Sequence, residues 1–342
     1  MKKYYISFLL FIICLLLSAQ TWNWAHTFGS SDSDVLWDLA VTPDGETVMV
    51  GYFEGTLQIG ALTVGTSAGN YDFFVAKFDI DGFPMWAVHG GGLELDQAKG
   101  VAIADDGTVY VSGSFEGEIT FADSTYYGIG VNSNCFIASL SSQGDLQWFQ
   151  HFAGTGPEDF YPAYGNSIAV ADDGRIAMAG RMWKRLTVGA ITLESSYYGD
   201  AFVIILNPDG TVNHAFNTDT SYDGRGYGVD FDAAGNVYLC GDYKGSIAFP
   251  DGTHPCTDDR EDVFIASWDA SGVYRWSDVI TGTGENVSWR LAVDDAGNCY
   301  TISDFYYYAT VGDTTLACPS PGYDICLTKH TTNGELQWVK QG

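Results

Sequence analysis

The chain has 342 residues and carries 43 Asp and Glu against 15 Lys and Arg, a net charge of −28 at neutral pH. A charge of this sign and size repels nucleic-acid phosphates and anionic lipid headgroups, so we expect neither nucleic-acid binding nor electrostatic attachment to a membrane. Hydrophobic residues make up 46% of the chain and aromatic residues 15%, which excludes a disordered chain and is enough to build a large core.

Residues 1–20 have the pattern of a secretory signal peptide. Two lysines precede an apolar run, 4–17, which ends at the small residues Ser18 and Ala19. The run is shorter than the roughly 20 residues of a membrane span, and no later segment is apolar enough to cross a bilayer. We therefore expect an exported protein without a membrane span, secreted, extracellular or at the cell surface, with the periplasm as the other possibility, and 21–342 as its mature domain.

Two series of turn glycines recur along the mature chain. The spacings are 62, 67, 61 and 62 residues in the first series and 62, 66, 62 and 62 in the second. The first series is Gly45, Gly107, Gly174, Gly235 and Gly297, and the second is Gly82, Gly144, Gly210, Gly272 and Gly334. A period this regular indicates repeated supersecondary units.

Alternating apolar and polar residues predict four short strands in each repeat, and no segment has helical periodicity. In repeat one, Leu39 and Val41 belong to the first strand, 47–50 to the second and 73–78 to the third, and Trp86 opens the fourth. Four antiparallel strands repeated radially predict an all-β fold, a β-propeller in which neighbouring blades hide each other's sheet edges. The complete blades are expected at approximately 35–90, 98–152, 165–217, 226–280 and 288–342.

Residues 22–29 resemble a fourth strand that lacks its first three, because Trp24 lies 62 residues before Trp86. Two arrangements follow. Either the sequence belongs to a longer propeller, or five blades close the ring and this orphan outer strand adds to the outer edge of blade five. The second arrangement is the expectation taken forward.

The turn between the third and fourth strands, together with the tryptophan four residues after its glycine, resembles the tryptophan-docking motif of quinoprotein propellers. That resemblance implies only that rings tie neighbouring blades together. Longer segments of the repeat, as in 200–210, 235–241, 51–55 and 113–117, resemble the SBBP-type bacterial β-propeller repeat. His214 for Trp, Asn134 for Asp and Ser303 for Gly depart from the pattern. The resemblance implies a secreted or surface protein of Bacteroidota-like bacteria without a general catalytic activity.

Both glycine series join consecutive antiparallel strands at the same end, so they lie on one face of the propeller. The long connections lie on the other face, which we call the long-loop face and where functional residues are expected. Aromatic side chains there suit a sugar ring or a protein partner, and the basic residues near position 181 suit an anion or an acidic glycan. Packing and ordinary ion pairs are the alternatives for both groups. The candidate ligand-binding residues are Trp183, Tyr197, Tyr198, Tyr306, Tyr307, Arg181 and Arg185.

Six cysteines remain in the mature chain, and export permits disulfides. Cys318 can pair with Cys326, eight residues away, or with Cys256 at the equivalent position of the preceding repeat. Cys240 and Cys299 have opposite parity on neighbouring blades, so they are expected to meet across the interface as buried thiols. No metal site is expected, because zinc-type Cys and His spacings are missing. Asp79–Gly82 begins like a calcium loop without its downstream Glu, so calcium is the one cofactor considered, against a simple turn.

The sequence contains no catalytic motif. We therefore expect a non-enzymatic, monomeric binding scaffold for a protein or glycan at the long-loop face. The alternatives are an extracellular carbohydrate-active enzyme and a purely structural surface component. Three or more buried carboxylates with raised pKa at the channel mouth would favour the enzyme, whereas an aromatic shelf without them would favour binding.

Overall fold

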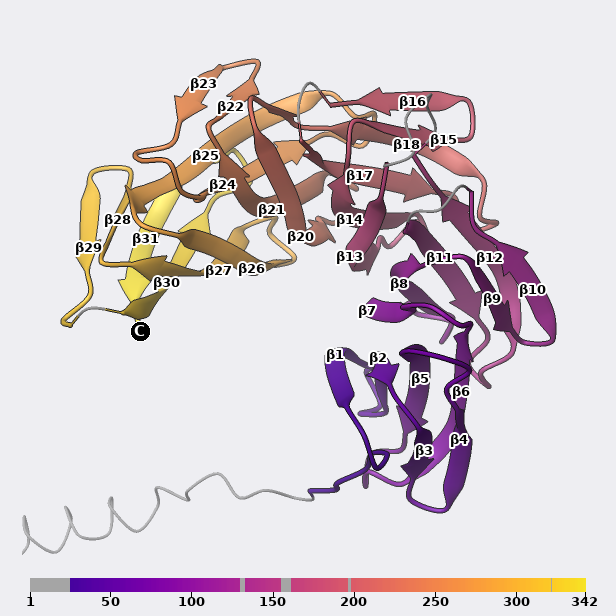
Figure 1. Ribbon diagram of the computed structural model, residues 1–342. Helices are drawn as coiled ribbons and strands as arrows, with labels where there is room; N and C mark the ends of the chain where they lie inside the picture. The colour runs from indigo at the N-terminus through magenta and orange to yellow at the C-terminus, as the bar shows by residue number, and fades with distance from the viewer. Residues whose placement is uncertain (1–24, 130–132, 155–160, 196–197, 321) are drawn as a thin grey trace, which may run out of the picture.

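The computed structural model describes residues 25–129, 133–154, 161–195, 198–320 and 322–342. Within these ranges every regular element is a β-strand, and no helix is long and apolar enough to cross a membrane. The strands form four-stranded antiparallel sheets arranged side by side in an arc around a central axis (Figure 1). This arrangement is that of a β-propeller, as the repeat predicts, and each sheet is called a blade below.

Five blades are formed by the described strands, each in the order first, second, third, fourth from the axis outward. Blade one comprises β1 (Asp34–Val41), β2 (Thr47–Phe53), β5 (Asp72–Phe78) and β6 (Pro84–Gly91); blade two β7 (Gln97–Ile103), β8 (Val109–Phe115), β11 (Asn134–Leu140) and β12 (Leu146–Phe152); blade three β13 (Ala163–Val170), β14 (Ile176–Met182), β17 (Asp200–Leu206) and β18 (Val212–Asn217); blade four β20 (Asp223–Phe231), β21 (Val237–Lys244), β24 (Asp262–Trp268) and β25 (Tyr274–Thr283); blade five β26 (Asn286–Val293), β27 (Cys299–Tyr306), β30 (Tyr323–His330) and β31 (Leu336–Gln341).

A small hairpin between the second and third strands of each blade reaches toward the preceding blade. In blade one the hairpin is β3 (Thr56–Ile59) with β4 (Leu62–Thr66), and its counterparts are β9 (Glu118–Phe121) with β10 (Ser124–Tyr127), β15 (Arg185–Val188) with β16 (Ile191–Glu194), β22 (Ser246–Phe249) with β23 (Gly252–Pro255), and β28 (Tyr308–Val311) with β29 (Thr314–Ala317). β9 pairs with β6 and β28 with β25, whereas β22 pairs with the short β19 (Asp219–Thr220) that follows β18. Backbone pairing thus continues from one blade to the next.

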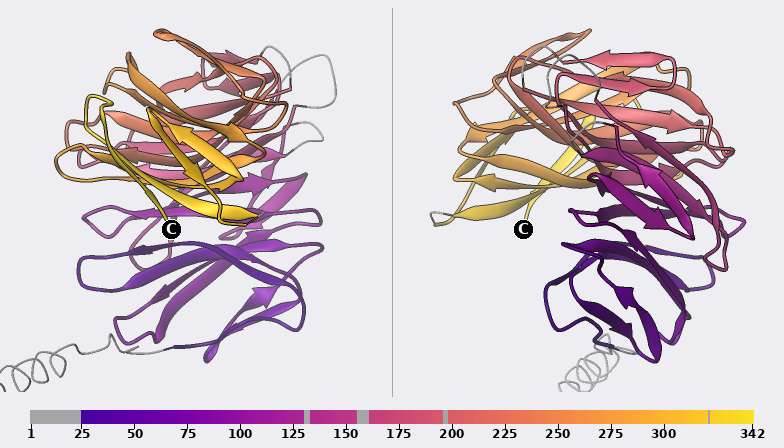
Figure 2. Two further views of the ribbon diagram at one scale, coloured as in Figure 1. Left: turned by 90° about the vertical axis from the view of Figure 1, so that its left-hand side faces the viewer. Right: turned by 45° about the vertical axis from the view of Figure 1, so that its right-hand side comes forward.

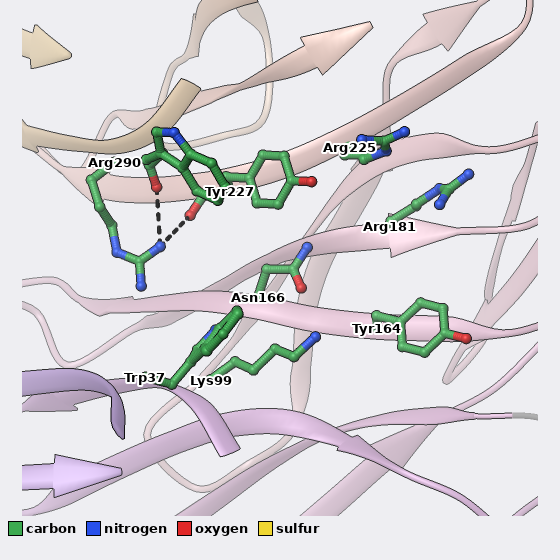
Figure 3. A pocket seen from close by; sticks show the side chains of 9 residues that line it. Trp37, Lys99, Tyr164, Asn166, Arg181, Arg225, Tyr227 and Arg290 are labelled. Atoms are coloured by element: carbon green, nitrogen blue, oxygen red, sulfur yellow. Dashed lines mark hydrogen bonds between the residues drawn. The ribbon is translucent and has the colours of Figure 1, made fainter. Parts of the chain in front are cut away.

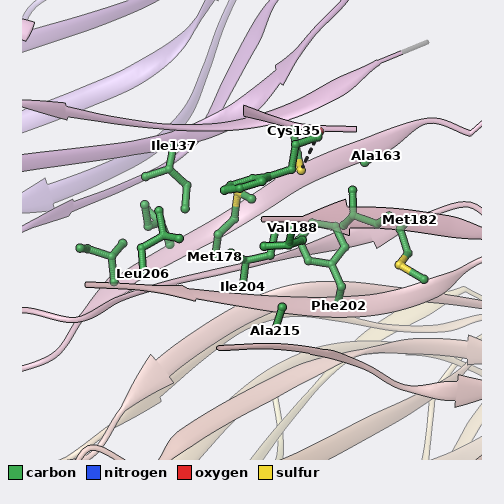
Figure 4. Close-up of a cluster of buried hydrophobic side chains, with 14 of the residues drawn as sticks. Cys135, Ile137, Ala163, Met178, Met182, Val188, Phe202, Ile204, Leu206 and Ala215 are labelled. Carbon is green, nitrogen blue, oxygen red and sulfur yellow. Dashed lines mark hydrogen bonds between the residues drawn. The ribbon is translucent and has the colours of Figure 1, made fainter. Parts of the chain in front are cut away.

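The third strands of blades one to four are buried on both faces. All seven residues of β5, β11, β17 and β24 are buried. The resulting cores lie between blades, and the cluster between blades two and three combines Ile137 and Cys135 with Ile204, Phe202 and Met178 (Figure 4). Each blade therefore depends on its neighbours for most of its hydrophobic stabilisation.

Tryptophan docking joins consecutive blades, as the resemblance implies. The Trp86 indole nitrogen donates to the Ser142 carbonyl at 3.0 Å, and Trp148 donates to the Pro208 carbonyl at 3.1 Å. The ring lies against the turn glycine, Gly144, whose φ of +90° and lack of space leave no room for a side chain. Position 214 keeps the geometry with a histidine, whose ring lies against Gly272.

The arc is open between blade five and blade one. Consecutive innermost strands contact one another from β1 through β7, β13 and β20 to β26, and Figures 1 and 2 show the open side between the sheet of β26–β31 and the sheet of β1. Two apolar faces border it. In blade five, Ile325 is 45% exposed and Leu327 is 37% exposed; in blade one, Leu39 is 50% exposed.

The expectation that the orphan N-terminal strand adds to blade five is wrong for residues 25–29; 22–24 lie outside the described residues. Gly29 bridges to Gln58 of the blade-one hairpin, and Phe28 packs on Phe74 and Phe78. In the following pair of blades, the fourth strand β6 of blade one lies beside β9, the first strand of the blade-two hairpin. Residues 25–29 hold the same position beside the blade-one hairpin. The segment therefore takes the outer-strand position beside blade one, on the open side of the arc, because its apolar side chain finds an uncovered face there.

The docking geometry makes Gly144→Ala destabilising. A β-carbon at this position would lie 2.8 Å from the Trp86 ring and would hold a strained positive φ. We expect a loss of about 1–3 kcal/mol of unfolding free energy in chemical denaturation. Gly252→Ala is the matched control, since nothing lies within 4 Å of the added carbon; equal losses in both variants would contradict the docking role.

The open side predicts unequal costs for equivalent truncations in blades four and five. Ile265 is fully buried, whereas Leu327, 62 residues later, is 37% exposed. Ile265→Ala should cost about 2–5 kcal/mol by leaving a cavity, and Leu327→Ala less than about half as much. Denaturation of both variants checks this, and equal losses would mean that something covers the blade-five face in solution.

Candidate functional site

The innermost strand of every described blade carries a β-bulge at the same place. The register shifts lie between Leu36 and Asp38, Ala98 and Gly100, Gly165 and Ser167, Gly226 and Gly228, and Ser288 and Arg290. A bulge adds one residue to a strand and turns its side chain out of the normal alternation. The added residues are Trp37, Lys99, Asn166, Tyr227 and Trp289, and all five line one cavity at the centre of the arc (Figure 3).

This central cavity has a volume of about 460 Å³, and Tyr164, Arg181, Arg225 and Arg290 complete its lining. Tyr164 and Arg181 are register partners near the start of β13 and the end of β14. They therefore lie toward the long-loop face, where the connections between the second and third strands leave the blades. Four aromatic rings, four cations and one amide in a cavity of this size match the composition of small-molecule binding sites.

Arg181 and Arg225 share one group of carboxylates on blade four. Arg181 Nη2 donates to both carboxylate oxygens of Asp223, at 2.6 and 2.7 Å. The Arg225 guanidinium lies 3.5 Å from the carboxylates of Asp223 and Glu261 and 3.6 Å from Asp242. Bidentate and networked arginine pairs hold their geometry well, so this cluster forms a rigid wall of the cavity.

Asp242 is the deepest member of the cluster. Its side chain is 1% exposed, and its Oδ2 lacks a hydrogen-bond partner among the described residues. Burial raises the pKa of Asp242 to about 8 in spite of the opposing charge of Arg225. The carboxyl therefore resembles a structural acid held inside the sheet rather than a group open to a ligand.

Arg290 and Lys99 differ from this pair. Arg290 donates to the backbone carbonyls of Tyr227 and Trp289, at 3.3 and 3.0 Å, and lies 3.8 Å from Asp38 of blade one (Figure 3). The Lys99 amine lies 5.5 Å from the centre of the Trp37 ring and 5.8 Å from that of Tyr164. Within the described part of the chain, no carboxylate lies within ion-pair distance of Lys99.

The structure brings two predicted residues to the mouth of the cavity. The Arg181 guanidinium stacks over the Trp183 ring at 3.4 Å, and Trp183 meets Tyr164 edge-on at 6.2 Å. Tyr198 is nearby on the same face: it contacts Tyr222 at 4.6 Å and precedes Gly199, which packs against Arg181. These contacts form an aromatic surface beside the paired arginines.

Other predicted residues lie elsewhere. Tyr306 contacts Tyr307 at 4.2 Å and Tyr323 at 5.1 Å, forming a separate aromatic group on blade five. Arg185 belongs to the outer hairpin, 3.8 Å from Glu194. Tyr197 lies outside the described residues.

The basic residues of blade three do not form one cluster. Arg175 lies on the turn face, where it pairs with Asp173 at 2.8 Å and donates to the carbonyls of Gly235 and Ala270. Arg181 alone among them lines the cavity. Arg175 and Arg185 pair within their own blade, whereas Arg181 pairs with Asp223 of the neighbouring blade. The cations of the cavity come from four different blades.

The six cysteines among the described residues are free thiols. Cys256 donates to the Tyr243 carbonyl and Cys318 to the Phe305 carbonyl, so the two hold equivalent places inside their own blades. Cys326 is buried in the core between blades four and five. Cys240 and Cys299 belong to the same core, as their opposite parity predicts, and desolvation raises the pKa of both thiols.

Among the described residues, no group of three or more His, Cys, Asp and Glu side chains is placed to hold a metal ion. The Asp79 carboxylate accepts the backbone N–H groups of Asp81 and Phe83, at 3.0 and 2.8 Å. It is therefore used inside its own turn, which is the simpler of the two interpretations of that segment.

The bulge residues were missed because alternation places them wrongly. Each lies eight residues before the first-series glycine of its own repeat, in phase with Leu39 and Val41, so an unbroken strand would aim it at the neighbouring blade. The bulge breaks the alternation at this residue, so its side chain turns into the cavity instead. One signal was present: this repeated position holds Trp, Lys, Asn, Tyr and Trp, with no aliphatic residue, whereas the position two residues later holds Leu, Val or Ile throughout.

Comparison with known proteins gives few relatives. No protein-family model matches the chain. A stretch of 99 residues is 31% identical to the regulatory protein FlaEY of Caulobacter vibrioides, which is 28% of this chain and 10% of that protein. The chain thus spans about a tenth of the length of this curated relative.

Solved structures resemble the chain weakly. A protein of unknown function from Bacteroides caccae has a TM-score of 0.37 at 11% identity, covering 79% of this chain and 90% of its own. The WD40 domain of Neurospora crassa Pan2 has a TM-score of 0.36 at 11% identity, with 84% and 90% covered. A gluconolactonase from Xanthomonas campestris has a TM-score of 0.32 at 12% identity, with 93% and 98% covered. Likenesses at this level carry no argument about activity.

The buried acid predicts a pH dependence of stability. Because burial raises the pKa of Asp242 from 3.8 to about 8, the folded state binds a proton that the unfolded state has lost between these values. The stabilisation of the folded state by this proton on Asp242 is fully present below about pH 4 and is lost as the pH rises to about 8. The unfolding midpoint, measured by circular dichroism, should therefore decrease as the pH rises over that range, and Asp242→Asn should make this decrease smaller. Asp106→Asn, an exposed change of equal charge on the turn face, should leave the fall as it is; the same flattening in both would contradict the assignment.

Proposed function

We propose that the protein is a secreted, monomeric, non-enzymatic β-propeller of SBBP-type repeats, and that it binds a glycan at the long-loop face, with the central cavity at the heart of the site. The observation that carries the proposal is the ring of bulge residues, which aims large polar and aromatic side chains from five blades into one cavity. A repeated structural device that places a different side chain in each repeat builds a specific lining, whereas packing alone would need only aliphatic residues there.

The electrostatics support binding over catalysis. Asp223, Asp242 and Glu261 lie together, yet they face two arginines that neutralise them. A glycosidase needs one carboxyl as acid and one as base or nucleophile, both open to the glycosidic bond. Asp242, whose pKa is raised to about 8 and would suit an acid, is 1% exposed and faces Arg225 instead.

Aromatic faces beside hydrogen-bonding groups favour a sugar over an extended protein partner. The cavity holds one or two sugar rings by volume; Tyr164 lines it, and the Trp183 ring meets Tyr164 edge-on at 6.2 Å. A protein partner, the other occupant considered for this face, would bury a wider and flatter patch. The proposal excludes nucleic acid as a ligand because of the net charge of −28.

The test is binding of the full exported chain to an array of neutral and acidic glycans and extracellular-matrix proteins, with calcium and with a chelator. We expect a saturable glycan signal that Trp183→Ala weakens by about tenfold or more, because the ring supports Arg181 and offers the aromatic face. Tyr127→Ala is the matched control, since Tyr127 is an exposed ring on the outer hairpin of blade two.

The other outcomes are informative. Binding to a matrix protein alone would replace the glycan by a protein partner. No binding by a folded, monodisperse protein would overturn the proposal for the ligands on the array. Signals lost on chelation would add calcium to the proposal.

A further inference from the structure

The cations of the central cavity differ in whether they have an acidic partner. Arg181 and Arg225 share the carboxylates of Asp223, Asp242 and Glu261, and Arg290 has Asp38 together with two backbone carbonyls. Lys99 has two aromatic rings and, among the described residues, no acidic partner. The lysine amine is thus the one cation of the cavity whose charge the described chain leaves uncompensated.

The surroundings of Lys99 make this uncompensated charge costly. Burial lowers the pKa of the Lys99 amine, because the aromatic walls replace water without supplying a negative charge. The aliphatic part of the side chain runs along Trp37, and the amine points toward Asn166 and Tyr164 (Figure 3). A bound carboxylate would restore the interaction that burial removes, as a charge-assisted hydrogen bond.

We infer that the cavity binds a sugar residue bearing a single carboxylate, a uronic acid, with the Lys99 amine as its carboxylate anchor. This inference rests on the proposed glycan binding and specifies its ligand. Trp37, Tyr164, Tyr227 and Trp289 offer ring faces to the apolar C–H surface of the sugar, and the Asn166 amide is placed to bond its hydroxyl groups.

Charge limits the ligand to one carboxylate. Among the described residues, Lys99 is the one cation of the cavity without a carboxylate partner, since the three arginines are paired, and the chain as a whole carries a net charge of −28. A ligand with several negative charges, such as a polyphosphate or a heavily sulfated glycan, would be repelled by this field and would find no further free cation in the cavity.

The test compares methyl β-glucuronide with methyl β-glucoside, which differ only in the carboxylate, by calorimetric titration of the full exported chain. We expect the glucuronide to bind at least about tenfold more tightly. Lys99→Met, which keeps an unbranched apolar side chain but removes the amine, should abolish that preference, and Lys99→Arg should keep part of it. Lys340→Met is the control, because it removes the same charge from an exposed residue of β31. Unfolding midpoints of all variants establish that they fold.

A second readout is chemical. Glucuronide should protect Lys99, but not Lys340, from acetylation by a water-soluble acylating reagent, measured by peptide mass spectrometry. Equal acetylation of Lys99 with and without a saturating concentration of glucuronide would overturn the assignment of the anchor.

The outcomes separate this inference from the proposed function. Equal binding of both sugars with no effect of Lys99→Met overturns the uronic acid assignment and leaves glycan binding intact. Binding of an acidic peptide or of acetate as tight as that of the glucuronide replaces the sugar by a simple carboxylate ligand and overturns the assignment. Binding of neither sugar also overturns it; if the glycan array is then empty as well, the proposed function fails with it.

Discussion

Each four-stranded sheet of this protein is apolar on both faces, so every sheet requires a neighbour on either side. The third strands express this constraint most clearly, because β5, β11, β17 and β24 bury every residue. A two-layer sandwich would leave one face of each sheet in water. Radial packing covers both faces with a single kind of interface, and the indole of one blade, seated on the turn glycine of the next, sets the distance between them.

The same constraint explains the two ends of the arc. β30 alternates between buried residues, such as Cys326 and Thr328, and exposed ones, such as Ile325 and Leu327, because only one of its faces is covered within the described residues. Blade one has the complementary uncovered face at Leu39, and Phe28 covers its outer part. The open side is thus bordered by surfaces of the kind that pack together everywhere else in the molecule.

Radial packing also creates the candidate site. Innermost strands converge on the axis, and their bulges release one side chain each from the interface between blades into the central cavity. Because each blade contributes from its own repeat, the lining combines residues that lie about 60 to 250 positions apart. Carboxylates of blade four hold the arginines of blades three and four in place, and Lys99 of blade two is left for a ligand.

Glycine spacing and residue alternation determined the fold class, the strands and the single face shared by both turn series, and the resemblance to quinoprotein propellers supplied the docking tryptophans. They did so because these features depend on short segments whose pattern repeats. The positions of Arg181 and Trp183 were also within reach, since Arg181 lies near the end of β14 and Trp183 follows that strand on the long-loop face. The cavity was not. A bulge shifts the phase of one residue without any local residue type that demands it, so alternation alone would place Trp37 and Lys99 on the packing face. The pairing of Arg181 with Asp223, 42 residues on, and the placing of residues 25–29 beside blade one depend on which blade adjoins which. Only the tertiary structure decides such contacts, because they join surfaces whose proximity no local sequence pattern specifies.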